Sequence, residues 1–307
     1  MVIGVLLVAC TGTPDVEPSS TASPDNSVVK ELADRVPDRI RADGFLSFGT
    51  DPSYPPMEFV DAEENLVGAD IGLAQALAKA LGLEPEFTLD AFTALDAGVR
   101  NQRYEAGIAA ISITADREAA TDAVLYLRAG TQLSHPVEAP QDVDQLCGLT
   151  VGTLEGSVQV ADLNQRSTTC TANGFRPVEI IAFVTQQEVT EALLGDDVDA
   201  MLTDSTVAVY EVGLHPRQLA TQPQVYDVLP YGILVDSRLP EFSQLLAETL
   251  DHLISSGDYE RILAEYGITT GLLTQASVVR NGQLVLNDDD GEVEEADAVA
   301  SPEPADG

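Results

Sequence analysis

The sequence predicts an α/β protein built from two similar lobes. Strand-like and helix-like segments alternate along the chain, the same order of elements occurs once in each half, and 307 residues suffice for about two domains. Alternation of this kind builds a parallel sheet that is covered by helices on both faces. Ligands of such sheets bind beyond the carboxyl ends of the strands, so functional residues are expected there.

The first 35 residues lie outside this pattern. Residues 1–10, "MVIGVLLVAC", form a short apolar run closed by small residues, which is typical of a secretory signal. Its end resembles the bacterial lipobox, whose cysteine becomes lipid-modified, although no basic residue precedes the run. We expect a lipoprotein signal over 1–10, lipidation of Cys10 and a flexible linker over 11–35, which is rich in Pro, Ser, Thr and Asp. The alternative is a buried strand that ends in Cys10.

Lobe 1 begins with a strand at Phe45–Gly49, a Pro-rich turn and a short strand. "GADIGLAQALAKALGL" places apolar residues on one helical face and ends at Gly82, a typical residue after a helix. A strand in "EPEFTL", a helix in "TALDAGVRNQRY" and a strand in "AGIAAISI" follow. "YGILV" and two helices broken at Ser255-Ser256-Gly257 return to this lobe, so we assign residues 36–132 and 233–275 to it.

Lobe 2 covers residues 133–232, begins within the polar crossover "TQLSHPVEAP" and repeats the order of elements. It contains a strand at Leu149–Thr153, a helix in "VADLNQRSTTC", a strand in "RPVEIIAF", a helix in "TQQEVTEALLGD" and a strand in "VDAMLTD". Residues 282–307 are acidic and Pro-containing, and we expect them to form a disordered tail.

Composition limits the partners and cofactors. The net charge of −36 repels nucleic acid and anionic lipid, so neither is expected as a partner. No apolar run reaches the roughly 18 residues of a membrane-spanning helix. The three histidines, at positions 135, 215 and 252, lack metal-ligand spacing, so we expect neither a metal nor another cofactor.

If Cys10 is acylated, Cys147 and Cys170 remain as a pair on an exported chain, for which a disulfide is the default and two buried thiols are the alternative.

Polar residues follow several of the predicted strands. "SITADR" brings Arg117, "TDPSYPP" brings an aspartate and an aromatic ring, and "TDS" brings Asp204. "EGSVQ" offers backbone N–H groups where a helix starts. The planar guanidinium of an arginine can bind both oxygens of a carboxylate, and an aspartate suits an ammonium group. Together these strand ends predict a receptor for a small zwitterion.

The chain also resembles the family 3 extracellular solute-binding proteins, which serve ABC importers of polar amino acids. The resemblance runs from about Val36 to Thr270 through "YPPMEF", "GADIGLAQALAKALG", "ISITADR", "DQLCGLTVGTLEGSVQ", "VDAMLTDSTVAVY", "YGILV" and "SGDYERILAEYG". It implies the two-lobed periplasmic-binding-protein type II fold with two crossover strands. The region from Cys147 to Gly174 is similar to members from high-GC Gram-positive bacteria, in which the two cysteines pair.

The resemblance also implies roles for individual residues. Arg117 would bind the ligand's α-carboxylate with help from Ser112, and Asp204 would bind the α-amino group. The remaining residues implied in ligand binding are Tyr54 and Phe92, which flank the ligand, Asp51, which reaches its side chain, Ala110 near its head group, and Ser157, Val158 and Gln159 in the loop of the second lobe. The sequence departs from the family at Ala109 and Ala110, where Ser or Gly is frequent, at Gly72, where a second Asp is common, and at Val158, where Thr is frequent.

Six of these residues also have a structural alternative. Arg117 can be a solvated surface charge, Tyr54 can pack the proline turn, and Phe92 can belong to the core. Asp51 and Asp204 can be helix N-caps because both follow strands, and Ser112 can cap a turn.

We therefore expect a monomeric, lipid-anchored protein on the outer face of the cytoplasmic membrane that binds an amino acid or similar zwitterion for an ABC permease and catalyses no reaction. The alternatives are an enzyme on the same fold, of the prephenate or arogenate dehydratase type, and an amino-acid sensor. A dehydratase needs a general acid or base in its pocket, and no histidine lies in the strand-end motifs.

Overall fold

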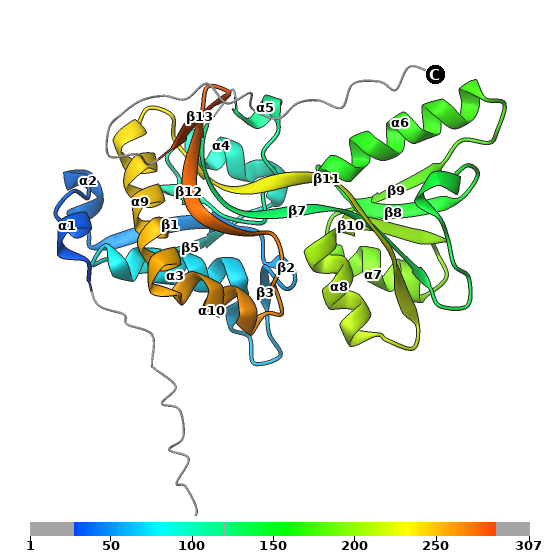
Figure 1. The fold of residues 1–307 in the computed structure, drawn as a ribbon, viewed down its shortest axis with the longest axis horizontal. Coiled ribbons are helices and arrows are strands. Elements are labelled where there is room, and N and C mark those ends of the chain that lie inside the picture. The colour runs from blue at the N-terminus through cyan, green and yellow to red at the C-terminus, as the bar shows by residue number, and fades with distance from the viewer. Residues whose placement is uncertain (1–27, 119–120, 287–307) are drawn as a thin grey trace, which may run out of the picture.

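The computed structural model describes residues 28–118 and 121–286. Figure 1 shows two α/β lobes that lie side by side and are joined by the long strands β7 (Asp122–Pro136) and β11 (Leu219–Val235). The predicted signal segment, Cys10 and the residues from 287 onward lie outside the described residues. Among the helices in the described ranges, none has the length and apolarity needed to cross a membrane.

Lobe 1 contains a parallel arrangement of β5, β1 and β6 with helices against it. Its strands are β1 (Phe45–Thr50), β5 (Glu84–Leu89) and β6 (Ala106–Gly107), and a small second sheet consists of β2 (Ser53–Tyr54), β3 (Glu58–Val60) and β4 (Leu66–Val67). Its helices are α1 (Lys30–Ala33), α2 (Asp38–Arg41), α3 (Ala69–Ala80), η1 (Phe92–Ala94), α4 (Leu95–Arg100), α5 (Ala115–Glu118), α9 (Pro240–Ser256) and α10 (Asp258–Glu265). The predicted face of α3 is buried, and Gly82 follows its C-cap with a φ of +72°.

Lobe 2 repeats this plan. Its parallel strands are β8 (Thr150–Leu154), β9 (Glu179–Phe183) and β10 (Ala200–Asp204), and its helices are η2 (Val143–Gln145), α6 (Val158–Ala172), α7 (Gln186–Leu194) and α8 (Ser205–Leu214). A capping box at Thr185 and Glu188 starts α7. Lobe 2 has two buried apolar clusters of its own, while the main cluster of lobe 1 also includes Leu154 and Val207 of lobe 2.

The two crossover strands connect the sheets of the lobes into one continuous path. In the described residues the order is β5-β1-β6-β11-β7-β10-β8-β9. β7 and β11 pair antiparallel with each other over most of their length, while β11 also pairs with β6 of lobe 1 and β7 with β10 of lobe 2. The predicted fold with two crossover strands is confirmed.

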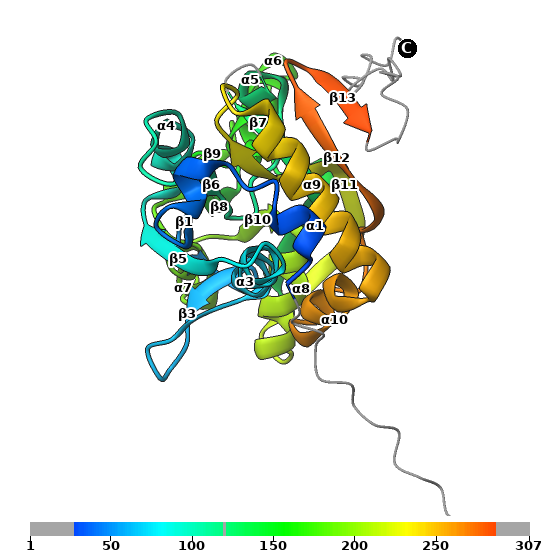
Figure 2. The same ribbon diagram turned by 90° about the vertical axis from the view of Figure 1, so that its left-hand side faces the viewer.

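The chain continues in a hairpin where the sequence predicted the start of a disordered tail. β12 (Leu272–Arg280) pairs with β7, and β13 (Gln283–Leu286) pairs with β12, so the prediction of disorder is wrong for the residues of β13. Asn281 and Gly282 have positive φ values of 51° and 76°, as the tight turn of a hairpin requires. Figure 2 shows the hairpin beside α9. Arg280 links β12 to lobe 1, because its Nε donates to the buried carboxylate of Asp122 at 2.8 Å.

The last residues of the predicted flexible linker are also structured. The backbone N–H of Val29 donates to the carbonyl of Ala80 at 2.8 Å, α1 begins at Lys30, and Arg35 forms an ion pair with Glu248 of α9. The prediction of a flexible linker is therefore wrong for residues 29–35, because main-chain and ionic contacts attach them to lobe 1.

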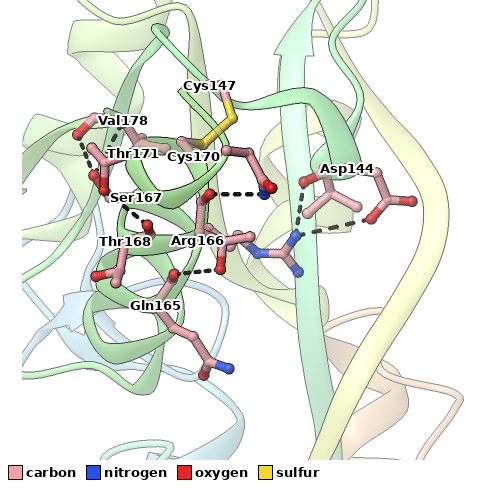
Figure 3. Close-up of a disulfide and its surroundings, with 12 residues drawn as sticks. Asp144, Cys147, Gln165, Arg166, Ser167, Thr168, Cys170, Thr171 and Val178 are labelled. Atoms are coloured by element: carbon pink, nitrogen blue, oxygen red, sulfur yellow. Dashed lines mark hydrogen bonds and ion pairs between the residues drawn. A yellow bond between two sulfur atoms is a disulfide. The ribbon is translucent and has the colours of Figure 1, made fainter. Parts of the chain in front are cut away.

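The two cysteines of lobe 2 form a disulfide, with an S–S distance of 2.02 Å. Figure 3 shows that the bond joins Cys170, on α6, to Cys147, which lies just before β8. The bond joins residues that are 23 positions apart in the sequence, and closing a loop of this length contributes roughly 3 kcal/mol to folding stability in the chain-entropy model. The default pairing that the sequence indicated is thus present, and the alternative of two free thiols is not.

Candidate functional site

A cavity lies where the two lobes meet, and its empty space, including the part open to solvent, is about 380 Å³. All ten residues that the resemblance implied in ligand binding line it, namely Asp51, Tyr54, Phe92, Ala110, Ser112, Arg117, Ser157, Val158, Gln159 and Asp204. Ser53, Glu58, Ala109 and Leu154 line it as well and were not selected as binding residues from the sequence. Residues from the strand ends of both lobes therefore lie in one cavity.

Arg117 reaches the cavity from α5 and is held by neutral groups. Its Nη1 donates to the carbonyl of Ser112 at 2.6 Å and its Nη2 to the carbonyl of Gly156 at 3.2 Å. The guanidinium lies 5.2 Å from the ring centre of Phe92. Arg117 is half-buried, and burial lowers its pKa, while the charges of Asp204 and Asp96 act in the opposite direction. A partly desolvated positive charge whose hydrogen bonds go to neutral carbonyls is suited to an anionic ligand group, which favours a binding role over a solvated surface charge.

Asp204 lies at the end of β10 and is only 6% exposed. Its Oδ2 accepts hydrogen bonds from Tyr54 at 2.9 Å and Tyr231 at 2.6 Å, and its Oδ1 accepts one from Gln159 at 2.7 Å. Burial raises the pKa of Asp204, while these three bonds and the charge of Arg117 oppose the shift. Asp204 occupies the N-cap position of α8, but its side chain makes no capping bond. Its carboxylate is therefore oriented by three side chains, of which Tyr54 and Gln159 line the cavity.

Contacts across the cavity join the two lobes. The hydroxyl of Tyr54, on lobe 1, lies 2.9 Å from Asp204 and 3.2 Å from Thr203, both on lobe 2. Arg117 of lobe 1 donates to Gly156 of lobe 2 in the same way. A side chain at Gly156 would collide with Thr93, and its φ of +76° also favours glycine. The two lobes thus approach closely on both sides of the cavity.

Asp51 and Phe92 are coupled on the lobe 1 wall. One oxygen of Asp51 accepts from the backbone N–H of Phe92 at 2.8 Å, and the other accepts from Ser53 at 2.7 Å. The N-cap alternative is therefore right in part, because Asp51 accepts from the first N–H of η1 although it lies 41 residues before that helix in the sequence. Phe92 packs against one apolar cluster of lobe 1 and also lies beside the guanidinium of Arg117.

The first turn of α6 forms the opposite wall. Ser157 is its N-cap residue without a side-chain capping bond, and Val158 and Gln159 follow it. The first N–H groups of a helix have no partner within the helix and carry partial positive charge. This wall therefore favours an anionic ligand group near Arg117.

Comparison with known proteins identifies the family. The model of the bacterial extracellular solute-binding proteins, family 3, matches residues 46–269. The chain belongs to this family. The family and the two-lobed fold that the sequence motifs predicted are confirmed.

Several relatives of this solute-binding protein bind arginine according to their names. It is 27% identical to the arginine-binding protein ArgT of Corynebacterium glutamicum over 90% of this chain and 93% of that protein. It is also 27% identical to a solved ancestral arginine-binding protein in complex with arginine, with a TM-score of 0.68 over 73% of this chain and 98% of the other. An ancestral amino acid-binding protein described as a precursor of cyclohexadienyl dehydratase has a TM-score of 0.67 at 22% identity, over 75% of this chain and 98% of the other, which shows the common fold alone.

One wall of the cavity in this family member departs from its predicted secondary structure. The predicted strand over "AGIAAISI" leaves the sheet after Gly107, since Ala110 has a positive φ of 46°. The N–H of Ala110 donates to Asp70 at 2.7 Å, and Ser112 returns to a single β-bridge with Tyr231. The turn places the main chain of residues 109–112 along the cavity, and the carbonyl of Ser112 holds Arg117.

Proposed function

We propose that this chain is the extracytoplasmic substrate-binding component of an ABC importer and that it captures an amino acid with a cationic side chain, with arginine as the first candidate. The observation that carries the proposal is that Arg117 from lobe 1 and Asp204 from lobe 2 line one cavity that contains further carboxyl groups. A ligand held by both residues bridges the lobes, and hinge motion about β7 and β11 then couples capture to closure.

The head group of the ligand would be bound by charge. Arg117 and the first turn of α6 would bind the carboxylate, and Asp204 would bind the ammonium group. A hydrogen bond to a charged group contributes about 1.5–3 kcal/mol, whereas a micromolar dissociation constant corresponds to about 8 kcal/mol. The two contacts would therefore supply a large part of the affinity.

The preference for a cationic side chain rests on a further carboxylate. Asp51 lines the cavity in addition to Asp204, so the cavity holds more negative charge than one ammonium needs. The arginine-binding names of the relatives agree with this excess of acid. Asp51 is the residue that we assign to the cationic side chain.

The Asp51→Asn variant tests this preference. It should weaken arginine binding by roughly tenfold, the effect of one charged contact, and leave glutamine binding almost unchanged. Asparagine keeps one acceptor oxygen for the N–H of Phe92, so the wall should stay intact. Calorimetric titration with both amino acids, after a thermal-shift screen of all twenty, measures the effect, and the exposed Glu63→Gln serves as the control. Equal losses for arginine and glutamine would contradict the assignment.

The mobile units and the membrane anchor are part of the same proposal. The two lobes, residues 36–132 with 233–275 and residues 133–232, would move as two rigid bodies. Small-angle X-ray scattering with and without arginine tests this motion, and a shape that does not change on arginine binding would contradict it.

Lipidation of Cys10 would hold the protein on the outer face of the cytoplasmic membrane. The Cys10→Ala variant should then appear in the medium or remain unprocessed, and unchanged membrane association by fractionation would contradict the anchor.

Binding without catalysis is the last part of the proposal. The relatives named above are binding proteins, while a dehydratase precursor has the same fold. No histidine lines the cavity in the described residues, but Glu58 could serve as an acid, so the enzyme alternative has a specific candidate. Turnover of prephenate or arogenate by the purified protein would favour that alternative over transport.

A further inference from the structure

Two buried carboxyl groups lie beside the ligand cavity. Glu58, on β3, lines the cavity and is 1% exposed, and Asp70, in the first turn of α3, is fully buried behind it. The backbone N–H of Asp70 donates to the carbonyl of Met57, the residue before Glu58, at 2.8 Å, and the two side chains interact. Two ionised carboxylates can only accept hydrogen bonds and would repel each other when buried side by side.

The unpartnered atoms of the pair indicate where a proton lies. Glu58 Oε2 and Asp70 Oδ1 are both buried and have no hydrogen-bond donor in the described residues. The other oxygen of Asp70 accepts from the N–H of Ala110 at 2.7 Å and from the hydroxyl of Tyr126 at 2.9 Å. One proton held between the two carboxyl groups would turn a contact between two acceptors into a hydrogen bond.

We propose that Glu58 and Asp70 share this single proton, that Glu58 carries it, and that the pair therefore presents one negative charge, centred on Asp70, to the ligand cavity. The donors to Asp70 favour its ionised form. The charges around Glu58 oppose its ionisation, because Asp51 and Asp204 face it in addition to Asp70, and Tyr126 offers only a neutral hydroxyl. Burial and these neighbours raise the pKa of Glu58 well above its usual range, while burial raises that of Asp70 to about 6.

The pair has a consequence for ligand selection, and this step rests on the proposed function. A cationic side chain in the cavity stabilises ionised Asp70. The affinity for a cationic ligand should therefore be highest well above pH 6 and decrease as the pH falls through about 6, because Asp70 then becomes protonated. A neutral side chain gains nothing from this charge. The pair thus makes Asp70 a specificity-determining residue, and Glu58 a positioning residue that supplies the proton.

Two isosteric variants separate the roles of the two carboxyl groups. Glu58→Gln replaces the protonated acid by an amide that still donates to Asp70, and it keeps the negative charge of the pair. Asp70→Asn removes that charge. In calorimetric titrations at pH 8, Glu58→Gln should bind arginine within about threefold of wild type, whereas Asp70→Asn should lose roughly tenfold for arginine and much less for glutamine, as expected for one charge near the ligand.

Each other outcome overturns the proposal. A large loss of arginine affinity in Glu58→Gln alone would place the charge on Glu58. Equal losses in both variants would mean that both groups are ionised. Unchanged affinity in both variants would mean that the pair carries no charge that the ligand senses. Infrared spectroscopy of the ligand-free protein at pH 8 tests the proton without any ligand. The C=O stretch of a protonated carboxylic acid should be present in wild type and absent in Glu58→Gln, and a wild-type spectrum without it would overturn the assignment even if arginine proves not to be the ligand.

Discussion

Replacement of Arg117 by alanine should weaken arginine binding by a few hundred-fold or more. The guanidinium is half-buried beside Phe92 and would be covered further by a bound ligand, so in the variant the ligand's carboxylate would lie in a desolvated cavity without its counter-charge. Breaking one partner of a buried ion pair costs about 3–5 kcal/mol. Calorimetric titration with arginine measures the loss directly.

The Arg117→Lys variant should fail almost as badly. An ammonium group cannot reach the carbonyls of Ser112 and Gly156 and also present two parallel donors to a carboxylate. Arg261→Ala is the matched control, because Arg261 forms surface pairs on α10 with Asp258 and Glu265. The control should change affinity by less than about 0.5 kcal/mol. An Arg117→Ala protein that binds arginine as wild type does would remove Arg117 from the proposed site.

The fold was predictable because its signals are local. The alternating strand and helix patterns, the break at 255–257 and the glycine after α3 each depend on a few neighbouring residues. The β12–β13 hairpin was missed, although Asn281-Gly282 between apolar residues is a strong hairpin signal. The acidic composition of the following tail obscured that signal. The structured part of the linker was missed for another reason, since Arg35 finds its partner on α9, far away in the sequence.

The site was predictable only as far as strand ends reveal it. The polar motifs at the strand ends identified Arg117, Asp204, the aspartate and aromatic ring of "TDPSYPP" and the N–H groups of "EGSVQ", and the resemblance supplied the rest of the set. Glu58 was missed because "PPMEF" gives an ordinary strand pattern, and its contact with Asp70 is formed only when β3 packs on α3. The bonds of Tyr231 and Gln159 to Asp204 are likewise tertiary and leave no mark in local sequence.

Asp204→Asn should lower arginine affinity by a few hundred-fold with little change in folding stability. The new amide oxygen can still accept from Tyr54 and Tyr231, and the amide of Gln159 can turn over so that its oxygen accepts from the new amide nitrogen. Thr131, which now accepts from Gln159 at 3.1 Å, has a hydroxyl that can donate instead. The hydrogen bonds are therefore preserved and the negative charge alone is removed.

The loss should therefore appear in binding and not in thermal unfolding. With the charge gone, the ligand's ammonium would be buried opposite a neutral amide, at a cost of about 3–5 kcal/mol for an unpaired buried charge. Because burial raises the pKa of Asp204, wild-type affinity should also decrease on acidification, whereas the residual affinity of the variant should lose this part of the pH dependence. Asp196→Asn, at an exposed position with a φ of +60° that asparagine accepts, is the control. A large fall in melting temperature with unchanged affinity would make Asp204 a structural residue and would leave Arg117 as the one charged residue assigned to the ligand's head group.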